Sequence, residues 1–315
     1  MKVFVTGADG FIGRNLCQRL QLHGMSVTKS ARLAPVDTDR SWVSTGDLAA
    51  NERLAALLAG HDVVVHLAGR AHEQREPRDE AERKYRLANL EGTRNLCRAS
   101  IDAGVQRFVF ISSIGVLGNN STRPLTEQDI PEPAEPYAQS KLAAEVALQS
   151  MAADGGIELV IIRPTLVYGP NCPGTMARLI RLVRSGIPLP FAGIEGRRSL
   201  IGIHNLEAMI ECAVTSPQAK GQVFLAADGE DVTLAELIRH IAAGLNIVPR
   251  LFSFPRPILL AAARLIGQGE SFAKLTASLQ VDPSKARNML GWRPEVSVEE
   301  GLRETARSFI AAGST

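Results

Sequence analysis

The chain has 315 residues, of which 45% are apolar and 22% charged, and its formal net charge is +2. This composition is typical of an ordinary globular protein, and the length suits one large domain with a smaller lobe. A nucleic-acid surface normally shows a strong basic excess or a basic cluster, which this chain lacks. We therefore expect no nucleic-acid partner.

The longest apolar stretch, Pro257–Ala263, is followed by Arg264 and is too short to span a bilayer. The N-terminal residues enter a strand pattern directly, without the charged and apolar regions of a signal peptide. These two features predict a cytoplasmic protein without a membrane partner.

The four cysteines are far apart and show no C-x-x-C spacing, which predicts neither a disulfide framework nor a metal site. The stretch from Arg70 to Arg86 mixes basic and acidic residues, and we interpret it as a solvated face.

A strand, a glycine-rich turn and a helix open the chain. The apolar run Val3–Val5 leads into three glycines with the spacing G-x-x-G-x-x-G, and an amphipathic helical pattern follows. Such a turn lets backbone N–H groups approach a pyrophosphate at the helix N-terminus. Gly7 is expected to make the tight turn, Gly10 to leave room for the phosphates, and Gly13 to let helix and strand pack closely. The alternative is a tight turn that binds nothing.

A second strand is predicted at Ser26–Thr28. NAD-preferring sites carry an acidic residue near this point, which binds the ribose 2′-hydroxyl. This chain has the segment 29–32 there, with Lys29 and Arg32 but no carboxylate. A cation can neutralise a 2′-phosphate, so Arg32 favours NADP(H); NAD(H) stays open, because both cations could simply be solvated.

Two further segments of the first half predict contacts with a dinucleotide. Asp47 and Leu48 close a segment where a short polar residue could bind an adenine edge, although Asp47 could equally be the N-cap of a following helix. The run 62–69 is a strand that ends at Ala68 and Gly69, small residues over which a cofactor can lie. His66 in its apolar interior is interpreted as a hydrogen-bonded core histidine.

The strand predicted at Arg107–Ile111 ends in Ser112 and Ser113. Hydroxyl groups at the carboxyl end of a parallel strand face the ligand crevice of an open α/β sheet. A proline-rich surface loop from Gly118 to Pro136 then leads into a helix that begins around Tyr137.

That helix carries the pattern Y-x-x-x-K, with Tyr137 and Lys141. Residues at positions i and i+4 lie on one helix face, so the phenol and the ammonium can point into the same crevice. With Ser113 they would form an acid/base device for hydride transfer at a carbinol or ketone. We expect the ammonium to lower the pKa of the phenol. The alternative is an incidental pair on a helix surface.

Taken together, these motifs resemble those of an extended short-chain dehydrogenase/reductase, the NAD-dependent epimerase/dehydratase group. The resemblance covers nearly the whole chain, including Arg163-Pro164, Arg198 and Gly291-Trp292. It implies an α/β fold, with a Rossmann-like doubly wound parallel sheet and a smaller, mainly helical C-terminal lobe. The implied boundaries are 1–165 for the dinucleotide-binding domain, with return segments near 197–228, and 166–196 plus 229–315 for the nucleotide-sugar-binding lobe.

The resemblance also implies roles for individual residues. The catalytic trio would be Ser113, Tyr137 and Lys141. Arg198 would contact the diphosphate of a UDP-sugar, which suits bidentate recognition by a guanidinium, and Ser112, Ser113 and Tyr137 would also contact the substrate. The implied cofactor-binding residues are Gly7, Gly10, Phe11, Ile12, Gly13, Arg32, Asp47, Leu48, Leu67, Ala68, Gly69, Asn89, Tyr137, Lys141 and Pro164. Family members usually form homodimers through helices of the Rossmann domain.

Two departures from the family pattern bear on the reaction. Sugar 4,6-dehydratases carry an Asp-Glu pair just after the catalytic Ser or Thr, whereas this chain has Ile114 and Gly115, which cannot move protons. Many epimerases carry Tyr where this chain has Leu117. With the segment Arg197-Arg198-Ser199-Leu200 and the missing acid after the second strand, this pattern looks closer to bacterial UDP-4-keto-6-deoxy-N-acetylhexosamine reductases of surface-polysaccharide (O-antigen) pathways.

The leading hypothesis is therefore an NAD(P)H-dependent reductase of the 4-keto group of a UDP-linked deoxysugar. The first alternative is a UDP-hexose 4-epimerase, which uses the same trio but keeps its NAD. The second is a non-catalytic, redox-sensing protein on a Rossmann fold, which would be expected to lack Tyr137 and Lys141.

Overall fold

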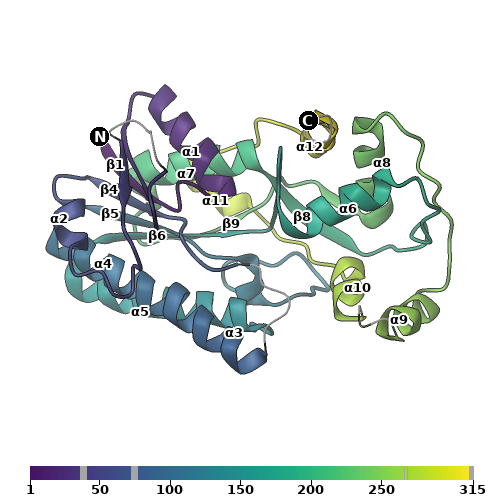
Figure 1. The fold of residues 1–315 in the computed structure, drawn as a ribbon, viewed down its shortest axis with the longest axis horizontal. Coiled ribbons are helices and arrows are strands. Elements are labelled where there is room, and N and C mark those ends of the chain that lie inside the picture. Colours follow the sequence, from purple (N-terminus) through teal and green to yellow (C-terminus); the bar gives the residue numbers. More distant parts are fainter. Residues whose placement is uncertain (36–40, 72–76, 266, 268, 312–315) are drawn as a thin grey trace.

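The structure is a computed structural model, and it describes the whole chain except residues 36–40, 72–76, 266, 268 and 312–315. A large parallel sheet covered by helices occupies one end of the molecule, and a smaller lobe occupies the other (Figure 1). The predicted fold class, an α/β Rossmann-like sheet with a smaller C-terminal lobe, is confirmed.

The main sheet has seven parallel strands in the order β3-β2-β1-β4-β5-β6-β9. The order reverses direction between β1 and β4, and ligands of open α/β sheets bind outside the carboxyl ends of the strands at such a switch point. The strands are β1 (Lys2–Thr6), β2 (Ser26–Ala31), β3 (Trp42–Ser44), β4 (Val63–His66), β5 (Arg107–Ile111), β6 (Glu158–Pro164) and β9 (Val223–Ala226).

Helices cover both faces of this sheet (Figure 1). One face packs against α1 (Phe11–Leu22) and α7 (Ile203–Thr215), with Leu16, Leu20 and Met209 in the core between them. The opposite face packs against α2 (Leu54–Leu58), α4 (Gly92–Asp102) and α5 (Pro136–Gly155). The remaining elements on this side are α3 (Arg78–Tyr85), the π-helix η1 (Arg86–Glu91) and the 3-10 helix η2 (Ile114–Leu117).

The smaller lobe has its own apolar core and a three-stranded sheet in the order β10-β8-β7. Strand β8 pairs parallel with β7 and antiparallel with β10. Its strands and helices, with the nearby elements that return to the main sheet, are β7 (Leu166–Tyr168), α6 (Gly174–Arg184), β8 (Arg197–Gly202), η3 (Pro217–Ala219), β10 (Asp231–Thr233), α8 (Leu234–Gly244), α9 (Arg256–Leu265), α10 (Gly269–Thr276), α11 (Ser284–Leu290) and α12 (Val298–Ala311).

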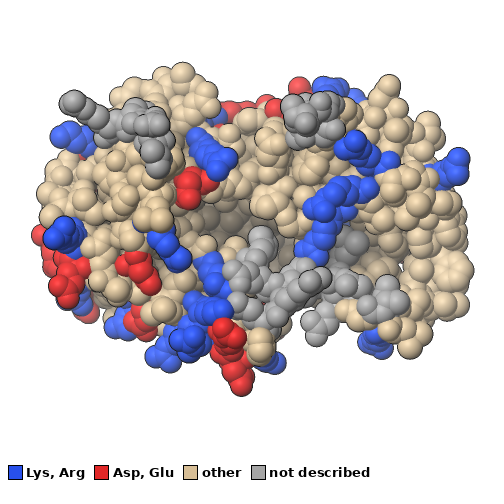
Figure 2. Space-filling view, viewed as in Figure 1, with Lys and Arg blue, Asp and Glu red and all other residues tan. Residues whose placement is uncertain are grey.

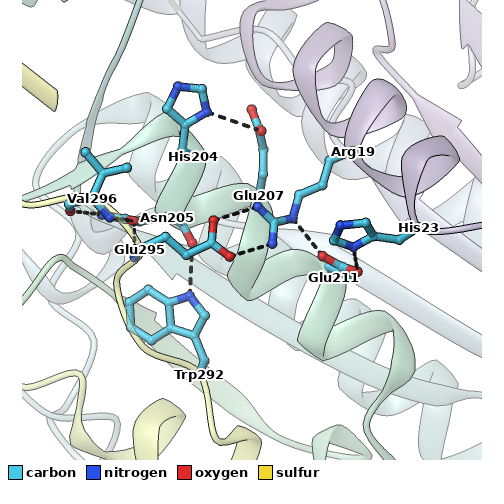
Figure 3. Close-up of polar contacts among 9 residues, drawn as sticks. All are labelled: Arg19, His23, His204, Asn205, Glu207, Glu211, Trp292, Glu295 and Val296. Atoms are coloured by element: carbon cyan, nitrogen blue, oxygen red, sulfur yellow. Dashed lines mark hydrogen bonds and ion pairs between the residues drawn. The ribbon is translucent and has the colours of Figure 1, made fainter. Parts of the chain in front are cut away.

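Polar contacts join α1 and α7 to the segment that precedes α12 (Figure 3). Arg19 donates two hydrogen bonds to Glu295, of 2.8 and 2.6 Å, and a third of 2.7 Å to Glu211. The side-chain oxygen of Asn205 accepts hydrogen bonds from the backbone N–H groups of Glu295 and Val296. The backbone carbonyl of Asn205 accepts one from the indole N–H of Trp292. These bonds hold the C-terminal segment against the main sheet's helical layer.

Several local predictions can be compared with the structure. The second strand continues to Ala31, three residues beyond its predicted end, and the short strand β3 was not predicted. The loop predicted from Gly118 onward is confirmed, and α5 begins with Pro136 at its first position. The predicted solvated face is confirmed for exposed residues between Arg78 and Arg86, whereas residues 72–76 lie outside the described part. None of the described helices is long and apolar enough to cross a membrane.

Candidate active site

The glycine turn has the tight geometry that its spacing predicts. Gly7 has a φ of +66°, which favours glycine, and a Cβ added to it would lie 2.8 Å from the backbone nitrogen of Ala68. A Cβ at Gly13 would lie 2.2 Å from the carbonyl oxygen of Gly7, so α1 can pack this closely on the turn only with glycine. Gly10 is the N-cap of α1 and puts no side chain over its N-terminus.

This turn fits a dinucleotide on the evidence of its shape and of nearby hydroxyl groups. The N-terminus of α1 favours an anion, and its first turn carries no acidic residue. Two buried hydroxyls near the carboxyl ends of β2 and β5, on Ser30 and Ser112, have no hydrogen-bond partner among the described residues. Buried hydroxyls are normally paired, so these two are available to a ligand.

Lys141 lies at the centre of the site. Its side chain is buried, and its Nζ donates a 2.9 Å hydrogen bond to the carbonyl of Ile111 and lies 4.7 Å from the centre of the Phe110 ring. Burial lowers the pKa of Lys141 to about 8, against a smaller opposite effect of the Glu145 carboxylate one turn further along α5. A lysine with this pKa is still mostly protonated at neutral pH.

Tyr137 stands at the beginning of α5, one turn before Lys141, and is half-buried. Its ring contacts that of Tyr85 edge-on, with 5.9 Å between centroids. Burial, with a smaller contribution from Tyr85, raises the pKa of Tyr137 to about 12. The expectation that Lys141 lowers this pKa is therefore not met, because the ammonium is bonded to the Ile111 carbonyl and burial dominates.

Ser113 directly follows β5 and caps η2, where its Oγ accepts a 3.1 Å hydrogen bond from the N–H of Gly115. A Cβ added to Gly115 would lie 3.3 Å from the Cβ of Ala138, the residue after Tyr137. Gly115 therefore lets the start of α5 approach the end of β5. The same contact leaves little room for a glutamate at this position.

Asn89 ties the loop after β4 to the catalytic helix. It is buried within the π-helix η1; its Oδ1 accepts from the N–H of Arg70, and its Nδ2 donates to the carbonyl of Arg70 and to Ser140 Oγ. Ser140 in turn donates to the carbonyl of Tyr137. A Cβ at Gly69 would lie 3.1 Å from Asn89 Oδ1 and 3.4 Å from Lys141 Nζ, so only a very small residue fits beside these two side chains.

His66 is a hydrogen-bonded core residue, as predicted. It is fully buried, with Nδ1 2.7 Å from the hydroxyl of Thr6 and Nε2 2.9 Å from that of Thr93. Thr93 donates its own proton to the Asn89 carbonyl, so Nε2 must be the donor and Nδ1 the acceptor. Burial, with a smaller effect of Lys141, lowers the pKa of His66 to about 3, which keeps the ring neutral.

The carboxyl end of β2 carries no carboxylate. Ala31 is buried and the side chain of Arg32 is exposed, next to the buried hydroxyl of Ser30. Asp47 is exposed and accepts a 3.0 Å hydrogen bond from the N–H of Ala49. Its alternative interpretation as an N-cap of α2 is wrong, because α2 is capped by Arg53, six residues later in the chain.

Arg198 lies in β8, on the side of the smaller lobe. It is half-buried, donates a 3.2 Å hydrogen bond to the carbonyl of Ala277, and has a pKa lowered by burial. Ala277 also lines an open cavity of about 660 Å³, whose other walls include Asn119 and Asn120 from the loop after η2 and Arg256 from α9. The face in Figure 2 is hollowed near its centre, with Lys and Arg side chains around the hollow.

The structure thus brings Lys141, Asn89 and Gly69 into direct proximity and places Ser113 beside the start of α5. Arg198 lies on the other lobe. Two features of the site were not predicted from the sequence: the contacts of Ser140, and the buried pair of Glu145 with Arg163, whose bonds measure 3.1 and 2.6 Å. Glu145 could have been found from its spacing, because it follows Lys141 by four residues and therefore lies on the same face of the helix. No group of His, Cys, Asp and Glu in the described part of the chain could hold a metal ion.

These features define a dinucleotide-dependent enzyme of the short-chain dehydrogenase/reductase class. They are a parallel sheet with a switch point, a glycine turn with room for a pyrophosphate, and a buried lysine at the strand ends. The chain belongs to the NAD dependent epimerase/dehydratase family, whose model matches residues 3–227. The family predicted from the sequence is therefore confirmed.

Individual relatives extend the comparison over the full chain. The UDP-glucose 4-epimerase of Vibrio cholerae is 39% identical over 99% of this chain and 96% of its own length. The crystal structure of the UDP-glucose 4-epimerase of Thermotoga maritima with UDP-glucose is 25% identical, with a TM-score of 0.78 and 99% of both chains covered. The UDP-glucuronic acid 4-epimerase of Bacillus cereus in complex with NAD shares the fold, with a TM-score of 0.81, 23% identity and 100% of both chains covered.

These relatives correct one detail of the sequence-based interpretation. We expected the nearest likeness among 4-keto reductases, because Leu117 replaces a tyrosine and no acid follows β2. The 39% identical relative is instead a 4-epimerase by name. Two local substitutions weigh less than similarity spread over the whole chain.

Proposed function

We propose that this enzyme is a UDP-sugar 4-epimerase that retains NAD through turnover. Ser113, directly after β5, and Tyr137 and Lys141, on the adjacent α5, support acid/base chemistry on a sugar hydroxyl or ketone. The observation that carries the choice of epimerisation is the similarity of the whole chain to a UDP-glucose 4-epimerase. A dehydratase is disfavoured, because Ile114 and Gly115 follow Ser113 and neither side chain can transfer a proton.

The protein's own groups act on the oxygen at C4 of the sugar. Ser113 donates a hydrogen bond to this oxygen and holds it near Tyr137. Tyr137 exchanges a proton with it, as the base when the alcohol is oxidised and as the acid when the ketone is reduced. Lys141 lies one helical turn further along α5, and its ammonium would favour the phenolate once it turns from the Ile111 carbonyl toward the phenol. The bound nicotinamide supplies the reversible hydride chemistry at C4.

The dinucleotide is proposed to lie across the glycine turn, with its pyrophosphate at the N-terminus of α1. Gly7, Gly10 and Gly13 shape this turn, and Phe11 and Ile12 contribute N–H groups of the first helical turn. The loop 67–69 would lie beneath the nicotinamide half, clamped by Asn89, and Lys141 would bind the ribose hydroxyls. Asp47 and Leu48 are proposed for the adenine end and Pro164 for the nicotinamide end.

The substrate's diphosphate is proposed to bind Arg198, whose planar guanidinium suits bidentate contact with phosphate. The neighbouring cavity of about 660 Å³ has space for a nucleotide-sized ligand. We also infer two domains. Residues 1–165, with α7 and β9 from the return segment near 197–228, would hold the dinucleotide, and the remaining lobe, which includes β8 with Arg198, would hold the sugar nucleotide. A homodimer through helices of the larger domain is part of the same proposal.

A second candidate function is the NADP(H)-dependent reduction of a UDP-4-keto-6-deoxysugar. Arg32 favours it, because this exposed cation follows β2 where NAD-preferring sites carry an acid. The reductase would use the same three residues, and Tyr137 would act only as the acid.

The two functions differ in whether the purified protein needs added cofactor. Purified protein should convert a UDP-hexose or UDP-N-acetylhexosamine to its C4 epimer without added cofactor, as followed by NMR, and should release NAD when denatured. The proposal fails if no UDP-sugar is epimerised while a UDP-4-keto-6-deoxysugar consumes added NADPH. Arg32→Asp would then shift cofactor preference away from NADPH.

A further inference from the structure

The far end of the smaller lobe exposes an apolar surface, formed by residues 246–265 and here termed the apolar tip. Large apolar side chains of this segment are strongly exposed, with exposed fractions of 91% for Val248, 89% for Leu265, 55% for Ile258, 44% for Phe252 and 41% for Phe254. Exposed apolar residues are normally scattered singly, so a segment of 20 residues that exposes these five large apolar side chains indicates an interaction surface.

The apolar tip is fixed to the lobe by its backbone. Leu189 donates a hydrogen bond to the carbonyl of Arg250 and accepts one from the N–H of Phe252, while Ala192 donates to the carbonyl of Phe252. The rings of Phe252 and Phe254 contact each other edge-on, with 6.5 Å between centroids. Both aromatic rings are therefore presented to solvent from an ordered backbone.

Helix α9 continues the same surface. Of its residues only Ala263 is buried, whereas Ile258 and Leu265 are exposed, and it packs mainly against α10. It lies at the end of the molecule away from α2 and the main sheet (Figure 1). A short amphipathic helix with this much exposed apolar surface is typical of segments that lie in the plane of a membrane interface.

The charge of the apolar tip has one sign. Residues 246–265 contain three arginines, Arg250, Arg256 and Arg264, all exposed, and no aspartate or glutamate. Arginine places its guanidinium at lipid phosphates while its aliphatic part stays among apolar groups. Basic and apolar side chains on one segment complement an anionic lipid surface.

A second copy of the chain fits this surface less well. A twofold contact would bring the same patch against itself, so that three arginines of each copy would meet without acidic partners from the segment. Nucleic acid is also a poor match, since exposed Phe, Ile, Leu and Val outnumber the cations. The combination favours a bilayer.

We propose that the apolar tip binds the surface of an anionic phospholipid bilayer. This docking goes beyond the proposed reaction and revises the expectation that the protein has no membrane partner. Helix α9 of the tip has 10 residues, which is too short to span the bilayer, so the tip would lie within the headgroup region. Because Arg256 also lines the cavity of about 660 Å³, docking would bring the mouth of the substrate site close to the lipid surface.

Vesicle sedimentation with the full-length protein tests the proposal. The protein should pellet with phosphatidylcholine vesicles that contain phosphatidylglycerol, and only weakly with phosphatidylcholine alone. The double variant Phe254→Ser/Ile258→Ser should lower the binding constant about tenfold, because it removes exposed apolar groups. Ile130→Ser, a change at another strongly exposed apolar residue, is the matched control and should bind normally.

The charge contribution is tested separately, so that the outcome does not depend on one variant folding. Each of Arg250→Gln and Arg264→Gln should weaken binding about fivefold, and raising the salt to about 0.5 M should release the protein. Arg53→Gln, an exposed arginine beside α2, is the control. Absence of pelleting with anionic vesicles, or equal pelleting of the tip variants, would overturn the proposal. So would sedimentation velocity showing that the tip variants only abolish self-association.

Discussion

The two sides of the candidate site are built differently. On the sheet side, contacts are short and the polar side chains around Lys141 are bonded to one another: His66 is bonded on both nitrogens, and Asn89 bonds to Arg70 and Ser140. On the lobe side, Arg198 donates to the carbonyl of Ala277, and Ala277 lines an open cavity whose walls come from segments as distant as residues 119 and 277.

This difference suggests that the sheet side carries out the reaction and that the lobe side determines which substrate binds. The paired groups of the sheet side leave little freedom to the loop after β4 or to Lys141, as hydride transfer requires a fixed geometry. The lobe side can vary in shape without disturbing the catalytic trio. Changes on the sheet side should therefore reduce kcat or stability, and changes on the lobe side should mainly alter KM.

The largest effect is expected for Tyr137→Phe. Loss of the hydroxyl removes the proton donor and acceptor, and kcat should fall about 10³-fold with KM little changed. Steady-state kinetics of the epimerisation provides the measurement. Tyr85→Phe, which keeps the ring packed against Tyr137, is the control and should retain most of the activity.

Next comes the buried pair behind the site. Glu145→Gln leaves the Arg163 guanidinium, only 6% exposed, without its charged partner, and should lower the free energy of unfolding by about 3 kcal/mol. Urea unfolding gives the value. Glu158→Gln breaks a more exposed pair with Arg107, which keeps three backbone carbonyl acceptors, and should cost at most about 1 kcal/mol. Equal losses in the two variants would contradict this ranking.

Gly13→Ala tests the close packing of the glycine turn. The new Cβ would lie 2.2 Å from a backbone oxygen, so α1 must shift, at a cost of about 2 kcal/mol. Retained dinucleotide, measured after denaturation, should also decrease. Gly60→Ala has a positive φ but open space around its Cβ, so it should lose only about 1 kcal/mol and keep its dinucleotide.

On the lobe side, Arg198→Lys should raise KM for the UDP-sugar about tenfold while kcat changes little, because a point charge replaces a bidentate contact. Arg197→Lys alters the neighbouring, exposed arginine of β8 and should leave KM near the wild-type value. A large fall in kcat for Arg198→Lys would mean that the lobe side shares in the chemistry.

The smallest effect on activity is expected at the joint between α1 and α7, where a change should appear only in the pH dependence of stability (Figure 3). Burial raises the pKa of Glu207 to about 8, with Arg19 opposing the shift and Glu295 adding to it. The unfolded chain loses this proton near its usual pKa, so stability falls as pH rises from about 4.5 to 8, by at most about 1.4 kcal/mol per pH unit. Glu207→Gln should flatten this slope between pH 6 and pH 7; an unchanged slope would assign it to other groups.

The sequence was most informative where structure is local. A strand, three glycines and a helix within thirteen residues specified the turn, and Y-x-x-x-K placed Tyr137 and Lys141 on one face. The raised pKa of Tyr137 could not be foreseen, because it depends on burial and on Tyr85 from another helix. The short strands β3 and β10 and the partners of Arg198 were also beyond reach, since they depend on segments far apart in the chain.

The most direct test of the central claim uses a UDP-sugar carrying deuterium at C4 and purified enzyme without added cofactor. The C4 epimer should appear with the deuterium still at C4, because the hydride leaves C4 and returns to it from one retained cofactor. Product that has lost the label, or no epimer unless NADPH and a 4-keto sugar are supplied, would contradict it.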